Sequence, residues 1–120
     1  MSNRPHVLIV EDDVELRASI ADLLKADGYE IDLATNGAEA INHLETSMRP
    51  CAVVVDLLMP GIVGQELLDY LRDDVALASI PVAIFSASPH LAPKGYRVFR
   101  KPLDMHPLLA FVRGCVAHCH

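Results

Sequence analysis

Short apolar runs alternate along the whole chain with segments that place apolar residues at helical spacing. The runs are His6 to Val10, Glu30 to Ala34, Ala52 to Val55, Ile80 to Phe85 and Arg97 to Arg100. Such an alternation is typical of parallel strands joined by helices, because parallel neighbours need a crossover connection and that crossover is right-handed. The pattern therefore predicts an α/β fold in which helices cover both faces of a five-stranded sheet.

The helical segments between the runs carry recognisable ends. Leu16, Ile20 and Leu24 have helical spacing, and Gly28 follows them as a stop signal. Asn36 is placed to cap a second helix at its N-terminus. Two further helices are marked by Leu67, Leu68 and Leu71 and by Leu108, Leu109, Val112 and Val116.

Length and composition predict one globular domain. The chain has 120 residues, of which 52% are hydrophobic and 22% charged, so we expect residues 1–120 to form a single domain. No apolar run approaches the ~20 residues of a membrane helix, and the N-terminus has no signal-peptide pattern, which predicts a cytoplasmic protein without a membrane contact. The formal net charge of −6 argues against direct nucleic-acid binding, which needs a clustered basic face.

Three cysteines, Cys51, Cys115 and Cys119, cannot all pair with one another. Cys51 lies in an apolar run, so buried free thiols are expected. The C-terminal residues also include His118 and His120, which together with the two nearby cysteines are soft-metal ligand types. Specific zinc sites use two separated ligand pairs, so we interpret this cluster as the frayed end of a helix.

Polar side chains follow four of the five predicted strands. They are Glu11, Asp12 and Asp13 after the first strand, Asp56 after the third, Ser86 after the fourth and Lys101 after the fifth. The carboxyl ends of parallel strands share one edge of the sheet, and functional groups gather there beside a reversal of strand order. Carboxylates at such close quarters repel one another unless a cation lies among them, and short oxygen ligands select a hard ion such as Mg²⁺.

Each of these residues also has a purely structural interpretation. Asp13 is expected to cap the helix that follows it. Asp56 precedes a proline-glycine loop, which a simple cap would not need. Ser86 alone would fit a turn, and Lys101 alone would fit an exposed surface position. Pro102, however, permits a bend that would aim the Lys101 ammonium toward Asp56.

Four motifs give the chain a resemblance to the receiver domains of two-component response regulators. They are VLIVEDD at the first strand, VVVDLLMPGIVG around Asp56, IPVAIFSA around Ser86 and RKPL at Lys101. The intervals from Asp12 to Asp56 and from Asp56 to Ser86 also match that family. The resemblance covers essentially the whole chain and implies a flavodoxin-like, doubly wound parallel sheet with the strand order 2-1-3-4-5.

The resemblance implies a metal site and a nucleophile. Asp56 is similar to the phosphoacceptor, which takes a phosphoryl group from a phosphohistidine. Asp12 is similar to the direct Mg²⁺ ligand, and Glu11 to the outer acid that holds the ion through water. Leu58 would offer its backbone carbonyl to the metal.

The resemblance also implies two groups that hold the phosphoryl oxygens. Ser86 is similar to the switch hydroxyl, and Lys101 to the cation that pairs with a phosphoryl oxygen. Phosphoryl transfer needs positioning and charge neutralisation more than covalent help. The implied partner is a sensor histidine kinase or a histidine phosphotransfer protein, and the chain would be a signalling phosphoacceptor and not an enzyme.

Residues 87–100 depart from the family pattern. The stretch is shorter than its counterpart, and Pro89, Pro93 and Gly95 favour turns, so the helix between the fourth and fifth strands is expected to be short or missing. Its loss would bare apolar side chains of these two strands. Either the loop, with Leu91 and Tyr96 as a lid, or another protein would cover them, and we expect a contact with a second copy or with the kinase.

Three other functions fit part of the pattern. A phosphatase of the haloacid dehalogenase type needs an acid two residues after its nucleophile, where this chain has Leu58. A flavin-binding protein would not place three acids where the cofactor phosphate binds. An interaction module that no longer takes phosphate would have lost a site residue, and none is lost. The chain ends soon after the last expected helix, which fits a free-standing regulator or a piece of a larger protein.

Overall fold

The computed structural model describes residues 4–56, 63–86, 92–100 and 105–119. Its elements are, in chain order, β1 (His6–Val10), α1 (Val14–Ala26), β2 (Glu30–Ala34), α2 (Gly37–Thr46), β3 (Ala52–Asp56), α3 (Val63–Asp73), β4 (Val82–Ser86), β5 (Arg97–Arg100) and α4 (Met105–Ala117). The strands form one parallel sheet in the order β2-β1-β3-β4-β5, which confirms the predicted fold class. Among the described helices, none is both long and apolar enough to cross a bilayer.

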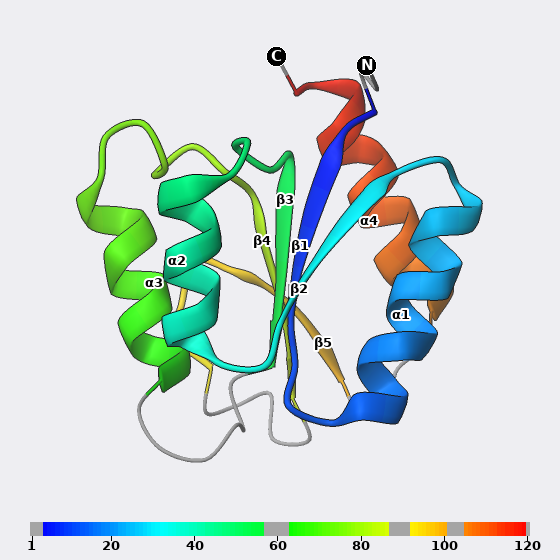
Figure 1. Ribbon diagram of the computed structural model, residues 1–120, viewed down its shortest axis with the longest axis horizontal. Coiled ribbons are helices and arrows are strands. Elements are labelled where there is room, and N and C mark those ends of the chain that lie inside the picture. The colour runs from blue at the N-terminus through cyan, green and yellow to red at the C-terminus, as the bar shows by residue number, and fades with distance from the viewer. Residues whose placement is uncertain (1–3, 57–62, 87–91, 101–104, 120) are drawn as a thin grey trace.

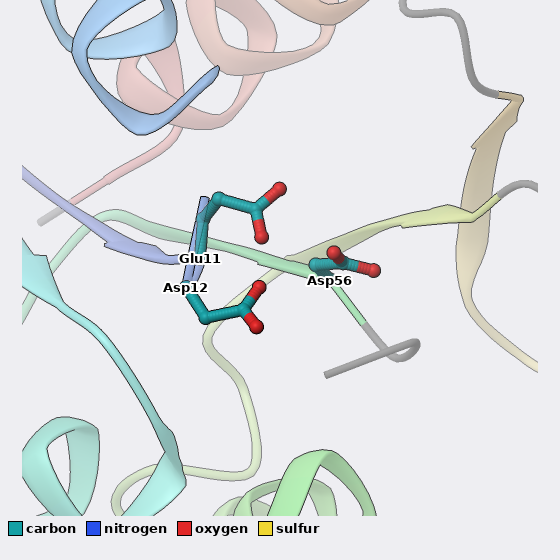
Figure 2. A group of neighbouring side chains, drawn as sticks. All are labelled: Glu11, Asp12 and Asp56. Carbon is teal, nitrogen blue, oxygen red and sulfur yellow. The ribbon is translucent and has the colours of Figure 1, made fainter. Parts of the chain in front are cut away.

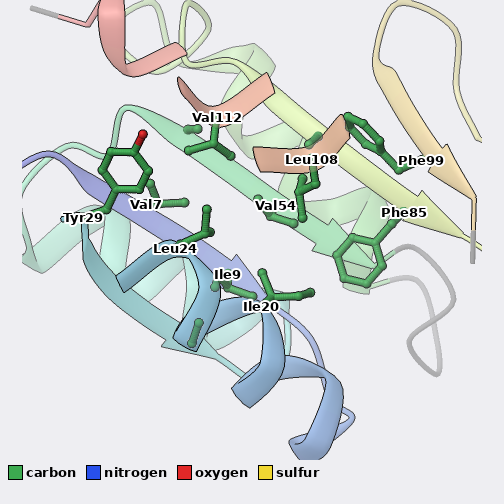
Figure 3. Close-up of a cluster of buried hydrophobic side chains, with 13 residues drawn as sticks. Val7, Ile9, Ile20, Leu24, Tyr29, Val54, Phe85, Phe99, Leu108 and Val112 are labelled. Atoms are coloured by element: carbon green, nitrogen blue, oxygen red, sulfur yellow. The ribbon is translucent and has the colours of Figure 1, made fainter. Parts of the chain in front are cut away.

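The sheet lies between two pairs of helices. Helices α1 and α4 cover one face, and α2 and α3 cover the other (Figure 1). Side chains alternate between these faces along each strand, so Val7 and Ile9 of β1 pack with α1 and α4, whereas Leu8 and Val10 pack with α2 and α3. Figure 3 shows the first of these clusters, in which Leu24 and Leu108 meet the sheet. Burial on both faces explains the near-continuous apolar runs of the central strands.

Local capping interactions fix where the helices begin. The Asp13 carboxylate accepts hydrogen bonds from the backbone N–H groups of Glu15 and Leu16, at 3.0 and 3.1 Å, which confirms its predicted role as a cap. The Asn36 side chain accepts a hydrogen bond from the N–H of Glu39 at 2.9 Å. Because the cap residue of α1 is Asp13, the two acids before it are left in the short turn between β1 and α1.

The predicted fourth strand begins two residues late. Pairing with β3 starts at Val82 instead of Ile80. Pro81 lacks an N–H and cannot donate to the ladder, although its carbonyl accepts a hydrogen bond from the Val53 N–H at 3.0 Å.

The link between β4 and β5 contains a turn in its described part. Residues 92–96 form no helix, and Gly95 has a φ of 95°, in the left-handed region that favours glycine. This agrees with the predicted short or missing helix, while Leu91 and Pro89 lie outside the described residues. Tyr96 packs against the core on the α2 and α3 face together with Val98. The chain itself thus covers part of the surface that the sequence predicts to be bare.

The cysteine prediction is wrong for two of the three thiols. Cys51 and Cys119, which are separated by 68 positions in the sequence, form a disulfide with their Cα atoms 5.5 Å apart, whereas Cys115 is free as predicted. Cys51 immediately precedes β3, and α4 runs back to that end of the sheet (Figure 1). The pairing thus follows from the topology. It also holds the end of the chain that the sequence interpretation treats as frayed.

Candidate functional site

Both backbone polar groups of Glu11, its N–H and its carbonyl, make hydrogen bonds at the end of β1. Its N–H donates to the carbonyl oxygen of Ala34 at 3.0 Å, which extends the β1–β2 ladder by one residue. Its own carbonyl accepts a hydrogen bond from Nη1 of Arg17 at 2.9 Å. The glutamate side chain is completely buried, with 0% of its surface exposed. A carboxyl group in such a place must be held by specific partners, because burial penalises its charged form.

The strand register brings Asp56 to the same level of the sheet. Val10 pairs with Val55, so Asp56, the last residue of β3, lies beside Glu11 on the neighbouring strand. Asp56 is 3% exposed, whereas Asp12 is exposed to solvent. One carboxylate oxygen from each of Glu11, Asp12 and Asp56 lies within 4.8 Å of the other two. Figure 2 shows these three side chains as neighbours. The structure therefore joins three of the predicted acids in one cluster, and separates Asp13 from them as a helix cap.

Burial and like charge perturb the acid cluster. The pKa of Glu11 is raised to about 7, first by burial and then by the hydrogen bond to Asp56 and the negative charge of that residue. The backbone N–H of Asp13, 3.4 Å from Oε2 of Glu11, acts in the opposite direction. A divalent cation among these oxygens would offset their mutual repulsion, because each carboxylate is attracted to the ion. Carboxylate oxygens without nitrogen or sulfur ligands fit a hard ion such as Mg²⁺.

Ser86 lies at the same edge of the sheet. It is the last residue of β4 and is buried, and the residue before it, Phe85, pairs with Asp56. Ser86 in turn pairs with Arg100, the last residue of β5. Lys101 follows Arg100 directly but lies outside the described residues, as does Leu58. The predicted residues that the structure describes, namely Glu11, Asp12, Asp56 and Ser86, are thus all at the carboxyl ends of β1, β3 and β4.

Arg17 also belongs to this site, although no motif in the sequence marks it. Its guanidinium bonds the carbonyl of Glu11 from the first turns of α1. A cation placed shortly after three acids was the available signal, but which backbone group it reaches depends on how α1 docks on the sheet. This hydrogen bond goes to the backbone carbonyl of Glu11 and not to a carboxylate, so through it Arg17 holds the backbone at the acid cluster.

Comparison with known proteins gives the same family over almost the whole chain. Residues 7–111 match the family described as response regulator receiver domain. The sensor histidine kinase TmoS of Ectopseudomonas mendocina is 33% identical over 97% of this chain, which corresponds to 12% of that protein. The response regulator Rre1 of Synechocystis is 32% identical over 92% of this chain and 51% of its own length. The chain therefore spans only part of these relatives.

Solved structures agree with the sequence comparisons. The receiver domain of the hybrid histidine kinase CckA is 33% identical and superposes with a TM-score of 0.76, covering 92% of this chain and 98% of that domain. The receiver domain of the Francisella response regulator 1452 is 26% identical, with a TM-score of 0.79 and coverage of 95% and 98%. With its five-stranded sheet of order 2-1-3-4-5 and its cluster of acids at the strand ends, this chain belongs to the response regulator receiver domain family.

Proposed function

We propose that this receiver domain accepts a phosphoryl group on Asp56 from a phosphohistidine of a sensor histidine kinase or a histidine phosphotransfer protein. The observation that carries the proposal is the cluster of Glu11, Asp12 and Asp56, whose carboxylate oxygens lie within 4.8 Å of one another. A carboxylate oxygen of Asp56 attacks phosphorus, the phosphorus–nitrogen bond of the phosphohistidine breaks, and its electron pair remains on the imidazole of the donor. The product is an aspartyl phosphate.

The other residues position and neutralise the transferred group. Asp12 and Asp56 would hold Mg²⁺ directly, Glu11 through water and Leu58 through its carbonyl. When bound, the ion supplies positive charge for the phosphoryl oxygens. The Ser86 hydroxyl donates a hydrogen bond to one phosphoryl oxygen, and the Lys101 ammonium pairs with another. The domain acts in this way as a signalling phosphoacceptor that turns over only its own phosphoryl group.

A module that binds partners without taking phosphate explains the acids less well. Glu11 and Asp56 lose almost all contact with water, which opposes folding as long as they are charged. A surface that only binds partners gains nothing from burying two carboxylates, whereas a site for an ion and a phosphoryl group uses them as ligand and nucleophile.

We propose a cytoplasmic location and a protein contact beside β4 and β5. Tyr96 and Val98 are partly buried apolar side chains in this region, and a second copy of the chain or the kinase would cover them further. Light scattering over a range of concentrations, with and without beryllofluoride, tests the homodimer. A single monomer mass under both conditions would rule it out and leave the kinase as the partner at this surface.

Phosphorylation by acetyl phosphate in Mg²⁺ buffer tests the central proposal. We expect acid-stable, alkali-labile phosphate on the peptide that contains Asp56, and complete loss of this label in Asp56→Asn and after chelation of the metal. Asp13→Asn is the matched control, since Asp13 caps α1 outside the acid cluster, and it should keep the label. Undiminished labelling of Asp56→Asn at another residue would refute the assignment.

A further inference from the structure

A cavity of about 730 Å³ lies at the end of the sheet opposite to the acid cluster, and all three cysteines line it. Its walls come from the segments before β3 and β4 and from the C-terminal half of α4, and include Pro50, Ile80 and Phe111. The disulfide between Cys51 and Cys119 forms part of the wall, and the free thiol of Cys115 lines the same cavity. None of these groups takes part in phosphoryl transfer.

We propose that the Cys51–Cys119 disulfide is a reversible redox site, opened by a low-molecular-weight thiol that enters this cavity, and that the disulfide fixes the C-terminal turn of α4 to the start of β3. The proposal rests on the proposed function only through the cytoplasmic location. In a reducing compartment, disulfides of ordinary proteins are usually transient and redox-sensing. The cavity gives the entering thiol a route to the sulfur atoms.

The two cysteine residues of the disulfide differ in exposure. Cys51 is only 8% exposed, and its backbone N–H is bonded to the carbonyl of His6 at 2.7 Å. Cys119 is half-buried and lies beyond the last helical residue, in a turn closed by its own N–H and the carbonyl of Val116 at 3.1 Å. Since exchange depends on access to the attacked sulfur, the entering thiol reacts at Cys119.

Two exchange steps then balance the reaction. The thiolate of the small molecule attacks Sγ of Cys119, the Sγ–Sγ bond breaks, and the electron pair leaves on Sγ of Cys51, which takes a proton from water. A second thiol attacks the external sulfur of the mixed disulfide and releases Cys119 as a thiolate, which is also protonated. The protein disulfide gains two electrons, and two small thiols become one small disulfide.

Cys115 is a weak internal nucleophile. Burial raises the pKa of its thiol, which lowers the fraction present as the reactive thiolate. Because Cys115 is outside the disulfide, it serves as an internal reference for thiol counting.

The packing of α4 determines which of its residues become mobile when the disulfide is reduced. Leu108 and Val112 are fully buried in the middle of the helix, and Arg113 forms an ion pair with Asp27 at 2.7 Å. Beyond Arg113, the apolar residues are only partly buried. Reduction should therefore loosen residues 114–119 and leave the first two turns in place.

Thiol counting in the full chain tests the redox site. The protein is equilibrated with mixtures of reduced and oxidised glutathione and then quenched with acid. Its free thiols are labelled with a maleimide under denaturing conditions, and mass spectrometry gives the number of labels. We expect one label in the oxidised form and three in the reduced form, since Cys115 is the one free thiol beside the disulfide. The control Cys115→Ser should give none and two, with an unchanged midpoint. Three labels in oxidised glutathione, or a disulfide that excess glutathione leaves intact, would overturn the proposal.

Hydrogen exchange tests the effect on α4. Amides of residues 114–119 should exchange on the order of tenfold faster in the reduced form, and Cys119→Ser should show the same rates without reductant. Equal exchange in both redox states would show that the disulfide does not fix the helix end. Asp56→Asn should give the same thiol counts as the wild type, so a failure of the phosphoryl-transfer proposal and a failure of the redox proposal are distinguishable.

Discussion

The two ends of the parallel sheet have opposite energetic roles. At the carboxyl ends of β1 and β3, three carboxylates lie within 4.8 Å of one another. At the amino ends, a disulfide joins Cys51 to Cys119, and an ion pair joins Asp27, just after α1, to Arg113 of α4. Interactions at the first end oppose folding in the absence of a cation, and those at the second end favour it. The fold thus carries its cluster of acids at one edge of the sheet, and its disulfide and ion pair at the other.

Truncation of a core residue near the disulfide end of the sheet should have the largest effect on stability. Leu24 of α1 is fully buried and lies near Tyr29 and Val7 (Figure 3). Leu24→Ala should lower the free energy of unfolding by about 2–5 kcal/mol, because it leaves a cavity. The partly exposed Leu33 of β2 provides the same substitution as a control, with a smaller loss. Urea unfolding measures the free energy of unfolding of both variants, and its dependence on urea concentration should be the same as in the wild type. Equal losses of this free energy in the two variants would contradict the comparison of the two ends.

Loss of the disulfide should have the next largest effect. Cys119→Ser should lower the free energy of unfolding of the oxidised protein by about 2–4 kcal/mol, because the bond closes a long loop and restricts the unfolded chain. The difference should disappear when both proteins are measured with a reductant. Cys115→Ser should leave stability nearly unchanged under either condition, and a loss as large as that of Cys119→Ser would mean that the pairing is different.

A substitution at the acid cluster should have the opposite sign. Glu11→Gln should raise the free energy of unfolding of the metal-free protein, on the order of 1 kcal/mol, because it removes a buried charge beside Asp56. It should also reduce the stabilisation gained from added Mg²⁺. Glu15→Gln, on the exposed surface of α1, is the control and should change neither quantity. A destabilised Glu11→Gln protein would show that the acid edge does not oppose folding.

The exposed ion pair between Asp27 and Arg113 should have the smallest effect. The hydrogen bond from Arg113 lowers the pKa of Asp27 below its usual 3.8, so the folded state binds this proton less tightly than the unfolded state. The contribution to stability is present above the unfolded pKa and is lost as the pH falls through the folded pKa. Asp27→Asn should therefore melt slightly below the wild type at neutral pH and together with it at low pH. Asp22→Asn is the control, and a difference that persists in acid would argue against the ion pair.

Local patterns in the sequence predicted most of the fold. The bounds of β1, β2 and β5, the cap at Asp13 and the end of the first helix before Gly28 depend on neighbouring residues, and all were confirmed. The disulfide could not be predicted, because it depends on two segments that only the finished topology brings together. The start of β4 was displaced because Pro81 lacks a donor for the ladder.

The site could be predicted as far as strand ends determine it. Glu11, Asp12, Asp56 and Ser86 follow from the rule that parallel strands end at one edge. The burial of Glu11 and the reach of Arg17 to its carbonyl depend on tertiary packing, so no local pattern reveals them. Leu58 and Lys101 lie outside the described residues, and their roles remain predictions.

The disulfide divides the molecule into a closed covalent loop, residues 51–119, and an N-terminal arm that contains β1 and β2. The sheet order keeps the two parts on separate sides, and they meet where β1 of the arm lies beside β3 of the loop. Glu11 and Asp12 therefore come from the arm, whereas Asp56 and Ser86 come from the loop. In the proposed Mg²⁺ site, neither part supplies all of the carboxylate ligands by itself. Binding of a divalent cation there would require that arm and loop have already assembled, and it would report on their docking.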